Sequence, residues 1–393
     1  MEESRRQSRS VCLITNTYPD FPESSRAVFM RDLARLLSQR NWTVAVVAPK
    51  VYAESRRHER EEAVEVFRFS SFLGGKLLVE YDRMPVFRLT GYMVSGIIKA
   101  ARQSQKCDLI HAHWVMPAGL IALIAGRLTR KPVVVTAHGS DILVMPKRSF
   151  LLRRIARHVL ERADAVTSVA EHVTAEIRNL DVRRDDILAF PMSVPTESFT
   201  PNGEGAEACA TETLIFSNRS LYPIYDLELL VRATPLILQR VPEASICIAG
   251  KGPQREALSQ LAEKLGVSGK LTFLGEIPHE QMPKYLRKTA AYVSTALSDG
   301  ASVSLLEAMA CGAVPVVADI PANREWIHDG RNGFLFAPGN AEALADKLEL
   351  CLTQPDLRKT AREINTRIVQ QRAQWNLNVD KLLNLYERIL ARQ

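Results

Sequence analysis

Short apolar runs recur along the chain, separated by longer stretches whose apolar residues repeat at helical spacing. Runs rich in Val, Ile and Ala are typical of strands that are buried on both faces of a parallel sheet. We predict such strands at residues 11–15, 43–48, 67–69, 108–114, 133–138, 165–168, 213–217, 245–249, 271–275, 290–296 and 314–318. We predict helices at residues 26–39, 84–102, 117–127, 147–162, 254–265, 302–311 and 375–391, with another ending near residue 352. Strands and helices that alternate in this way predict an α/β fold with doubly wound sheets.

The chain is long enough for two domains, and its composition changes once near the middle. It has 393 residues, enough for two cores of ordinary size. Residues 201–211 are rich in Gly, Glu and Ala and interrupt the pattern of strands and helices. We therefore predict an N-terminal Rossmann-like domain at residues 1–199, a linker at 200–212 and a second Rossmann-like domain at 213–374.

The stretch at residues 297–315 concentrates the polar chemistry of the second domain. Its turn at Asp299 and Gly300 opens directly after a predicted strand. Open α/β sheets bind their ligands at this carboxyl edge. Ser302 and Ser304 lie at the start of the next helix, where unpaired N–H groups and the helix dipole favour anions. The turn is therefore a candidate phosphate site.

Two carboxylates, Asp299 and Glu307, flank this turn. A carboxylate repels a phosphate but accepts hydrogen bonds from sugar hydroxyls. Phosphate-binding N–H groups beside hydroxyl-binding carboxylates indicate a site for a sugar nucleotide. The same residues are also compatible with an ordinary capped helix whose Glu307 is solvated.

The stretch at residues 297–315 resembles the acidic-x7-acidic signature of retaining glycosyltransferases of the GT-B fold, family 4, and the run from Ser304 to Ala318 matches it almost residue for residue. Those enzymes usually have Glu at both acidic positions, whereas this chain has Asp299 first and Glu307 second. Asp is shorter by one methylene group, which reduces its reach by about 1.5 Å and keeps its charge. The resemblance extends over nearly the whole chain and is most specific at residues 213–336.

The resemblance implies two Rossmann-like domains facing each other across a cleft, with the last helix, residues 375–393, packing back on the N-terminal domain. It also implies that an Arg, and a Lys five residues later, hold the donor diphosphate. Arg219 matches the Arg, but Ile224 occupies the position of the Lys. Lys251 is a candidate for the missing charge because the Gly residues beside it allow close approach to a phosphate. The predicted donor-binding residues are Arg219, Lys251, Gly300, Ser302, Val303, Ser304 and Glu307.

The predicted catalytic residues are His138, Asp299 and Glu307. The resemblance implies that His138 of the N-terminal domain lies beside the transferred sugar. It also implies that Asp299 holds a hydroxyl of that sugar and Glu307 the ribose hydroxyls. A lone His at the end of a strand is equally compatible with a structural role. By resemblance, the leaving phosphate itself takes the acceptor proton, so no separate general base is expected.

We expect no metal ion and no other cofactor. The sequence contains no Asp-x-Asp motif. His111 and His113 occupy alternate positions on one predicted strand and could supply two metal ligands, but no third ligand is indicated. The loop at residues 17–25 lacks the G-x-G-x-x-G pattern, which argues against a nicotinamide dehydrogenase.

The net charge of +7 comes from the first half of the chain. Residues 1–200 hold 30 Lys and Arg against 22 Asp and Glu. No basic run with interleaved aromatic residues indicates a nucleic-acid groove, so we expect an anionic membrane surface or an anionic acceptor instead. The basic amphipathic helix at residues 147–162 either packs on the sheet or rests on anionic lipid.

The sequence gives no sign of a signal peptide or of a membrane-spanning segment. The six cysteines are scattered, and residues 1–6 are too polar for a signal-peptide core. No apolar stretch approaches the roughly 20 residues needed to span a bilayer. We therefore expect a cytoplasmic protein, with a peripheral position on the inner face of the membrane as a further expectation.

Taken together, these features predict a retaining hexosyltransferase. It would move a sugar from a nucleotide diphosphate sugar to a glycan or lipid-linked acceptor in polysaccharide or glycoconjugate biosynthesis. Two alternatives stay open: a non-catalytic GT-B partner subunit, which the absent Lys and the shorter first acid suggest, and an enzyme of the sugar-nucleotide epimerase type, which shares the fold.

Overall fold

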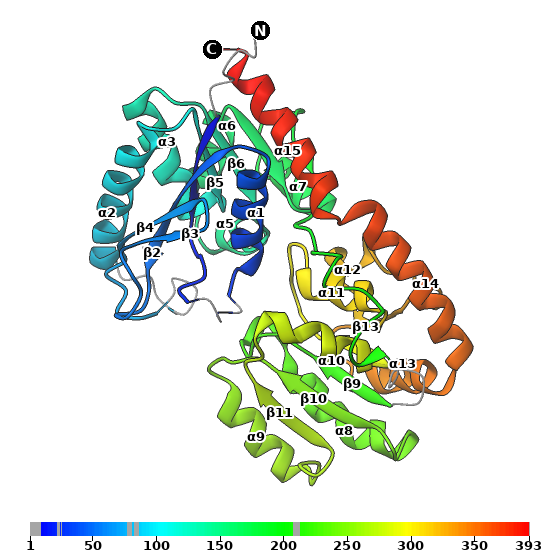
Figure 1. Cartoon of the computed structure of the whole chain (residues 1–393). Coiled ribbons are helices and arrows are strands. Elements are labelled where there is room, and N and C mark those ends of the chain that lie inside the picture. Colours follow the sequence, from blue (N-terminus) through cyan, green and yellow to red (C-terminus); the bar gives the residue numbers. More distant parts are fainter. Residues whose placement is uncertain are drawn as a thin grey trace, which may run out of the picture. The chain divides into compact units, whose positions relative to one another are not determined.

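The computed structural model describes residues 9–21, 24, 26–76, 81, 86–206 and 213–392. The predicted polar N-terminus, part of the loop at 17–25, the first two residues of the predicted helix at 84–102 and half of the predicted linker lie outside these residues. The chain divides into two compact units (Figure 1). Unit 1 comprises Met1–Pro191 and Trp375–Gln393, and unit 2 comprises Met192–Gln374.

Unit 1 contains an eight-stranded sheet with the order β3-β4-β2-β1-β5-β6-β7-β8. Its strands are β1 (Ser10–Thr15), β2 (Thr43–Lys50), β3 (His58–Glu61), β4 (Val64–Ser70), β5 (Leu109–His113), β6 (Val133–Ala137), β7 (Ala165–Ser168) and β8 (Leu188–Ala189). β3 is antiparallel to β4, and the other pairs are parallel. From β1 the chain moves to β2 on one side, and from β5 it moves to β6 on the other. The gap between the carboxyl ends of β1 and β5 is therefore the topological switch point of this sheet.

The helices of unit 1 include the last helix of the chain. They are α1 (Val28–Gln39), α2 (Val86–Ser104), α3 (Leu120–Thr129), α4 (Ser140–Leu143), α5 (Met145–Arg148), α6 (Phe150–Arg162), α7 (Glu171–Arg178) and α15 (Trp375–Leu390). α2 packs beside α3, whereas α15 packs beside α1 (Figure 1). The ring of Tyr386 on α15 lies 5.2 Å from that of Trp42, so aromatic packing joins the last helix to the first unit.

The predicted helix at residues 147–162 is wrong as a single element. Ser149 has extended backbone angles (φ −163°, ψ 138°) and separates α5 from α6. Its hydroxyl accepts a hydrogen bond from the N–H of Leu151 at 3.2 Å, which stabilises the start of α6. The apolar spacing continues across this break, so the pattern alone did not reveal it.

Unit 2 contains a six-stranded parallel sheet with the order β11-β10-β9-β12-β13-β14. Its strands are β9 (Leu214–Ser217), β10 (Ser245–Ala249), β11 (Leu271–Gly275), β12 (Ala291–Ser294), β13 (Val314–Ala318) and β14 (Phe334–Phe336). Its helices are α8 (Leu227–Arg240), α9 (Arg255–Lys264), α10 (Met282–Lys288), α11 (Val303–Cys311), α12 (Pro321–Arg324), α13 (Ala341–Thr353) and α14 (Pro355–Arg372). The predicted elements of this unit do not include β14, α8, α10, α12 or α14.

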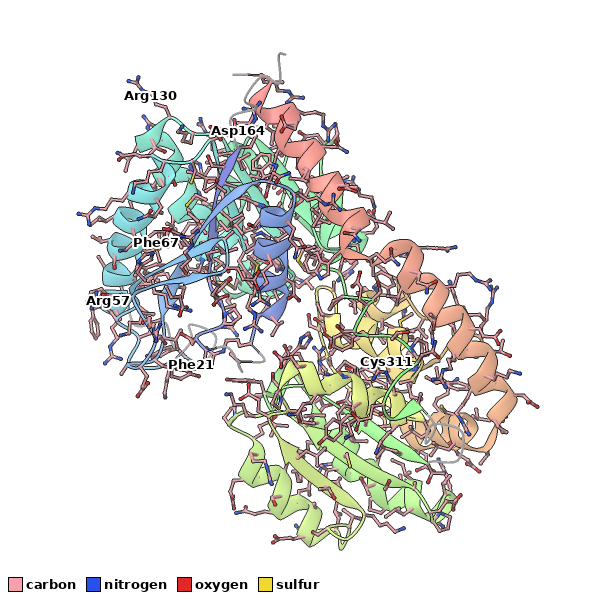
Figure 2. All side chains as sticks on the ribbon, viewed as in Figure 1. Phe21, Arg57, Phe67, Arg130, Asp164 and Cys311 are labelled. Atoms are coloured by element: carbon pink, nitrogen blue, oxygen red, sulfur yellow. The ribbon has the colours of Figure 1, made fainter. Side chains whose placement is uncertain are left out.

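Alternate residues of these strands enter two hydrophobic layers. Ile215 of β9 packs in a layer with residues of α8, α9 and α13. The next residue, Phe216, packs in the opposite layer with residues of α10, α11 and α14. Cys311, labelled in Figure 2, is the last residue of α11 and is buried in this second layer. The two sheets and the helices that cover them confirm the predicted α/β fold class. The second layer fixes α11 against the sheet.

Candidate active site

The candidate site of unit 2 lies where β9 and β12 end. From β9 the chain continues through α8 to β10 on one side, and from β12 it continues through α11 to β13 on the other. The gap between the carboxyl ends of β9 and β12 is therefore the topological switch point of this sheet. Arg219 follows β9, and the loop from Thr295 to Ser302 connects β12 to α11. The topology therefore brings residues about 80 positions apart in sequence to one edge.

Arg219 is the centre of this cluster. Its Nη1 donates hydrogen bonds to the hydroxyls of Ser302 at 2.6 Å and Ser304 at 2.8 Å. Its Nη2 donates to Oδ2 of Asp299 at 2.6 Å, which makes a buried ion pair. The ring of Tyr225 lies 4.3 Å from the guanidinium carbon, within the range of a cation–π interaction. The Nε–H of Arg219 is buried and has no hydrogen-bond partner among the described residues.

These contacts determine the electrostatics of the cluster. Burial opposes the charge of Arg219, but the neighbouring Asp299 carboxylate raises the pKa of the guanidinium above its usual value. Arg219 is therefore a permanent cation whose charge is balanced by one carboxylate. Three of the five N–H groups of the guanidinium are thus donated to Asp299, Ser302 and Ser304.

Hydrogen bonds fix the geometry at the start of α11. The hydroxyl of Ser302 caps the helix by accepting a hydrogen bond from the N–H of Leu305 at 3.3 Å. Ser304 accepts a hydrogen bond from the hydroxyl of Tyr292 at 2.9 Å. Burial raises the pKa of Tyr292 to about 12, so this phenol stays a donor at neutral pH. Gly300 donates its N–H to Oδ1 of Asp299 at 3.0 Å, which holds the carboxylate in the turn.

Glu307 occupies the next turn of α11 and is almost fully buried. Its Oε1 lies 2.7 Å from Nε2 of His279, whose ring lies 5.0 Å from that of Phe199. The alternative of a solvated Glu307 is therefore wrong. The sequence did not predict the contact with His279, and no spacing between residues 279 and 307 signals it.

Lys251 lies in a neighbouring loop and is mostly exposed. Its Nζ forms an ion pair with Glu276. Its backbone carbonyl accepts a hydrogen bond from the N–H of Leu221 at 3.0 Å, so the loop lies beside the segment that follows Arg219. A Cβ on Gly252 would lie 2.4 Å from the carbonyl oxygen of Leu221. That glycine is thus required for packing of the loop, whether or not a ligand binds.

Ile224, at the position of the absent Lys, lies in a short helical turn, Pro223–Tyr225, and is partly exposed. Its carbonyl accepts a hydrogen bond from the N–H of Leu297 at 2.9 Å. The carbonyl of Tyr225 accepts one from the hydroxyl of Thr295 at 2.7 Å. Two loops of the site are thereby tied to each other, and the ring of Tyr225 is held over Arg219.

His138 belongs to unit 1 and lies just after β6. Its Nε2 is 2.9 Å from Nδ1 of His113, and its ring stacks on that of Trp114 with centroids 4.2 Å apart. Asp141 orients the loop, because its carboxylate accepts hydrogen bonds from the N–H groups of His138 at 3.1 Å and Val115 at 2.7 Å. These contacts join the loops after β5 and β6 at the carboxyl edge of the sheet.

His111, His113 and His138 are neutral at pH 7. Burial lowers the pKa of His113 to about 3. Burial, with the neighbouring histidines, also lowers the pKa values of His111 and His138 well below the usual range. Both ring nitrogens of His111 are in hydrogen bonds, to Tyr386 at 2.5 Å and Thr136 at 2.6 Å, which leaves none for a metal. Among the described residues, no group of three or more His, Cys, Asp or Glu side chains is placed to hold a metal ion.

Two family models match most of the chain. The model described as "Glycosyl transferase 4-like domain" matches residues 27–192, and the one described as "Glycosyl transferases group 1" matches residues 206–367. They correspond to unit 1 and unit 2.

Curated relatives carry the same kind of name. A GDP-mannose-dependent alpha-(1-6)-phosphatidylinositol monomannoside mannosyltransferase of Mycolicibacterium smegmatis is 27% identical over 256 residues, or 61% of this chain and 65% of the relative. The chain thus spans just under two thirds of the length of that relative. An N-acetyl-alpha-D-glucosaminyl L-malate synthase of Bacillus anthracis is 23% identical over 320 residues, or 79% of this chain and 82% of the relative.

Solved structures share the fold over the whole chain. A sucrose-phosphate synthase from Thermosynechococcus elongatus has a TM-score of 0.83 at 18% identity, covering 98% of this chain and 100% of that one. Anabaena Alr3699/HepE, solved in complex with UDP and glucose, has a TM-score of 0.77 at 18% identity, covering 97% and 100%. Together with the family models and the relatives, this likeness identifies the chain as a glycosyltransferase of the GT-B fold.

Proposed function

We propose that this glycosyltransferase is a retaining enzyme that takes a hexose from a nucleoside diphosphate sugar bound by unit 2. It transfers the hexose to a glycan or a lipid-linked acceptor. One observation supports this most directly: a buried arginine, Arg219, converges with Ser302 and Ser304 on the start of α11. A permanent cation beside free helix N–H groups is the arrangement that a leaving diphosphate requires.

The leaving group sets the catalytic task. Negative charge grows on the diphosphate as its bond to the sugar breaks. Arg219 and the N–H groups of Ser302, Val303 and Ser304 stabilise that charge, each preorganised donor contributing about 3–4 kcal/mol. The leaving phosphate then takes the proton of the acceptor hydroxyl.

Asp299 has two successive partners in this proposal. Before the donor binds, it balances the charge of Arg219. A diphosphate that displaces it from Nη2 frees the carboxylate to accept a hydrogen bond from a hydroxyl of the transferred sugar. The exchange keeps the buried guanidinium paired at every stage, which avoids the cost of an unpaired buried charge.

Glu307 and His138 complete the set of proposed catalytic residues. Oε1 of Glu307 already lies at His279, and its carboxylate has further lone pairs for the ribose hydroxyls. His138 acts as a neutral hydrogen-bond partner of the transferred sugar, since burial keeps its pKa well below neutral pH. We also propose that transfer needs no metal ion, so a chelator should leave the rate unchanged.

A thermal-shift panel tests the donor. The chain is titrated with UDP, GDP, ADP and the glucose, galactose, N-acetylglucosamine and mannose forms of these nucleotides. A ligand present at 100 times its Kd stabilises the native state by about 2.7 kcal/mol, which such an assay resolves. Glu307→Gln should lose the shift, whereas the matched control Glu263→Gln, an exposed residue of α9, should keep it. A panel with no shift would contradict donor binding.

A second measurement separates transfer from binding alone. Incubation of the chain with the donor that gives the shift should release the free nucleoside diphosphate when an acceptor is present. A donor that binds without release, with every acceptor tried, would favour a non-catalytic partner subunit instead. Retention is checked by the anomeric configuration of the new linkage.

The place of action follows as a proposal as well. No helix of the described residues is long and apolar enough to cross a membrane. We propose that the enzyme works in the cytoplasm, at the inner face of the membrane, where a lipid-linked acceptor presents its head group.

A further inference from the structure

Helix α2 of unit 1 exposes a row of apolar side chains. Every fourth position from Tyr92 to Ser104 is buried against the unit. The row on the outer face, also at every fourth position, is exposed and reads Val86, Thr90, Val94, Ile98 and Arg102. In Figure 1, α2 lies at the outer side of unit 1, next to α3.

Two aromatic side chains extend this row. Phe87, in the first turn of α2, is 77% exposed, and Phe72, in the loop after β4, is 55% exposed. Phe72 lies against the helix, because a Cβ on Gly91 would come within 2.9 Å of its ring. We call Phe72, Val86, Phe87, Val94 and Ile98 the α2 stripe. Single exposed apolar residues are normal on protein surfaces, but five on one helix face and its adjoining loop are not scattered.

The charge around the α2 stripe has one sign. α2 carries Arg88, Lys99 and Arg102 and contains no Asp or Glu. None of these three cations has an ion-pair partner within the part of the chain that the structure describes. The guanidinium of Arg88 lies 5.7 Å from the ring centre of Phe87, so a cation lies directly beside an exposed apolar ring.

Helix α6, the basic helix that the sequence first suggested for a membrane contact, offers a shorter apolar face. Its neighbour Lys147 pairs with Glu176, Arg153 lies near Asp181 at 3.4 Å, and Arg157 pairs with Glu161 at 2.9 Å. Arg148, Arg154 and Arg162 have no ion-pair partner among the described residues, so unpaired charge alone does not distinguish this segment from α2. Its large exposed apolar side chains, Phe150 and Leu151, lie in the first turn of α6, whereas those of α2 extend from Val86 to Ile98.

We propose that the α2 stripe rests on an anionic membrane, with its apolar side chains among the lipid head groups and acyl-chain ends. Arg88, Lys99 and Arg102 contact the lipid phosphates. An apolar face flanked by cations is what binding parallel to a bilayer surface requires. The inference refines the peripheral position proposed above and names its surface. It does not depend on the transfer reaction, because the surface contains no donor-site residue.

Sedimentation with vesicles tests the proposal. The full chain is mixed, without donor or acceptor, with vesicles of phosphatidylcholine containing about 30% phosphatidylglycerol, and with vesicles of phosphatidylcholine alone. We expect at least about tenfold stronger binding to the anionic vesicles at low salt, and weaker binding at high salt. Failure to bind anionic vesicles would overturn the proposal and leave the donor assay unaffected.

Matched variants locate the surface. Phe87→Ser with Val94→Ser and Ile98→Ser should reduce binding about tenfold or more, and so should Arg88→Glu with Arg102→Glu. The control changes Leu128, Phe150 and Leu151 of α3 and α6 to Ser; these side chains are also exposed and should be dispensable. The donor-induced thermal shift, measured on each variant, checks that the chain is folded.

Two outcomes would overturn the assignment. Binding that survives in the α2 variants and is lost in the α3 and α6 control would transfer the contact to the other helices. A wild-type chain that self-associates without vesicles, and becomes monomeric when the α2 stripe is changed, would show that a second copy of the chain covers this face.

Discussion

Both units place polar side chains at the carboxyl ends of central strands but give them different electrostatic character. In unit 2, Arg219 and Asp299 follow the strands at the switch point and form an ion pair. In unit 1, His113 ends β5 and His138 follows β6, and both are held as neutral rings. One edge is therefore organised around charge and the other around neutral hydrogen bonds.

In the proposed function, this difference assigns different tasks to the two units. A site with a permanent cation and helix N–H groups suits the diphosphate, whose charge grows during the reaction. A neutral histidine beside an aromatic ring suits a sugar, which offers hydroxyls and apolar C–H faces. The predictions below break or sharpen this comparison by changing charge on each side.

Removal of the cation of unit 2 should have the largest effect. Arg219→Ala is expected to lower kcat/KM by about 10²–10³-fold, because the leaving diphosphate loses its buried charge partner. Arg219→Lys should recover only part of the loss, since a point charge cannot reproduce contacts to Asp299, Ser302 and Ser304 together. Steady-state kinetics with the donor identified above gives the measurement.

One control is needed because Arg219→Ala leaves the partly buried carboxylate of Asp299 without its guanidinium partner. The double variant Arg219→Ala with Asp299→Asn removes that charge as well. It should regain stability and remain inactive. Restored activity in the double variant, or a loss below about tenfold in Arg219→Ala, would contradict the role given to this arginine.

Acidification should lower the free energy of unfolding of unit 1. The lowered pKa values of His111, His113 and His138 mean that below pH 6.5 the unfolded chain binds more protons than the folded chain. The free energy of unfolding then decreases by about 1.4 kcal/mol for each histidine when the pH is lowered by one unit. Asp141 opposes this below pH 6, because burial raises its pKa to about 6 and the folded carboxyl is protonated first. The three histidines outweigh the one carboxyl.

Urea unfolding at pH 7.5, 6.5 and 5.5 measures this dependence. Trp326→Phe leaves only tryptophans of unit 1, so fluorescence reports that unit alone. In this background His113→Gln should reduce the pH slope by about one proton. An unfolding free energy that rises on acidification would refute the neutral cluster.

Much of the fold and part of the site were predictable from the sequence. Buried strands such as β12 and β13 are continuous apolar runs, and a turn between a strand and a helix places Asp299 and Ser302 at the ligand edge of a sheet. α14 was missed although Leu357, Ala361, Ile364 and Ile368 recur at helical spacing, because charged and polar residues dominate the segment between them. The break at Ser149 was missed because one capping residue decides it.

The contacts inside the site were not predictable. Arg219 has several polar neighbours, and packing decides that it pairs with Asp299 while Tyr225 covers its face. His279 and Glu307 meet because α11 packs on the layer beside α10, a relation between elements that no local pattern contains. Composition and spacing identify which residues reach one edge. They do not identify which atoms pair there.

Loss of the aromatic cover should have an intermediate effect. Tyr225→Leu removes the cation–π contact with Arg219, which is worth about 0.5–2 kcal/mol. Affinity for the nucleoside diphosphate should fall by about tenfold, as measured by calorimetry. Tyr225→Phe keeps the ring and should bind nearly as well as the wild type. Equal losses in both variants would instead assign the effect to the phenol hydroxyl.

The smallest effect concerns the missing second cation of unit 2. Ile224→Lys places an ammonium on a partly exposed turn beside Arg219 and should tighten binding of the nucleoside diphosphate by about threefold to tenfold at low salt. Ile224→Met is the neutral control. Lys251→Met should change affinity by less than about twofold, because that side chain is 63% exposed and already pairs with Glu276. If Lys251→Met instead weakens binding as strongly as Ile224→Lys strengthens it, Lys251 provides the second charge. The positive charge at the site of unit 2 would then come from two loops, while the histidine cluster of unit 1 stays neutral.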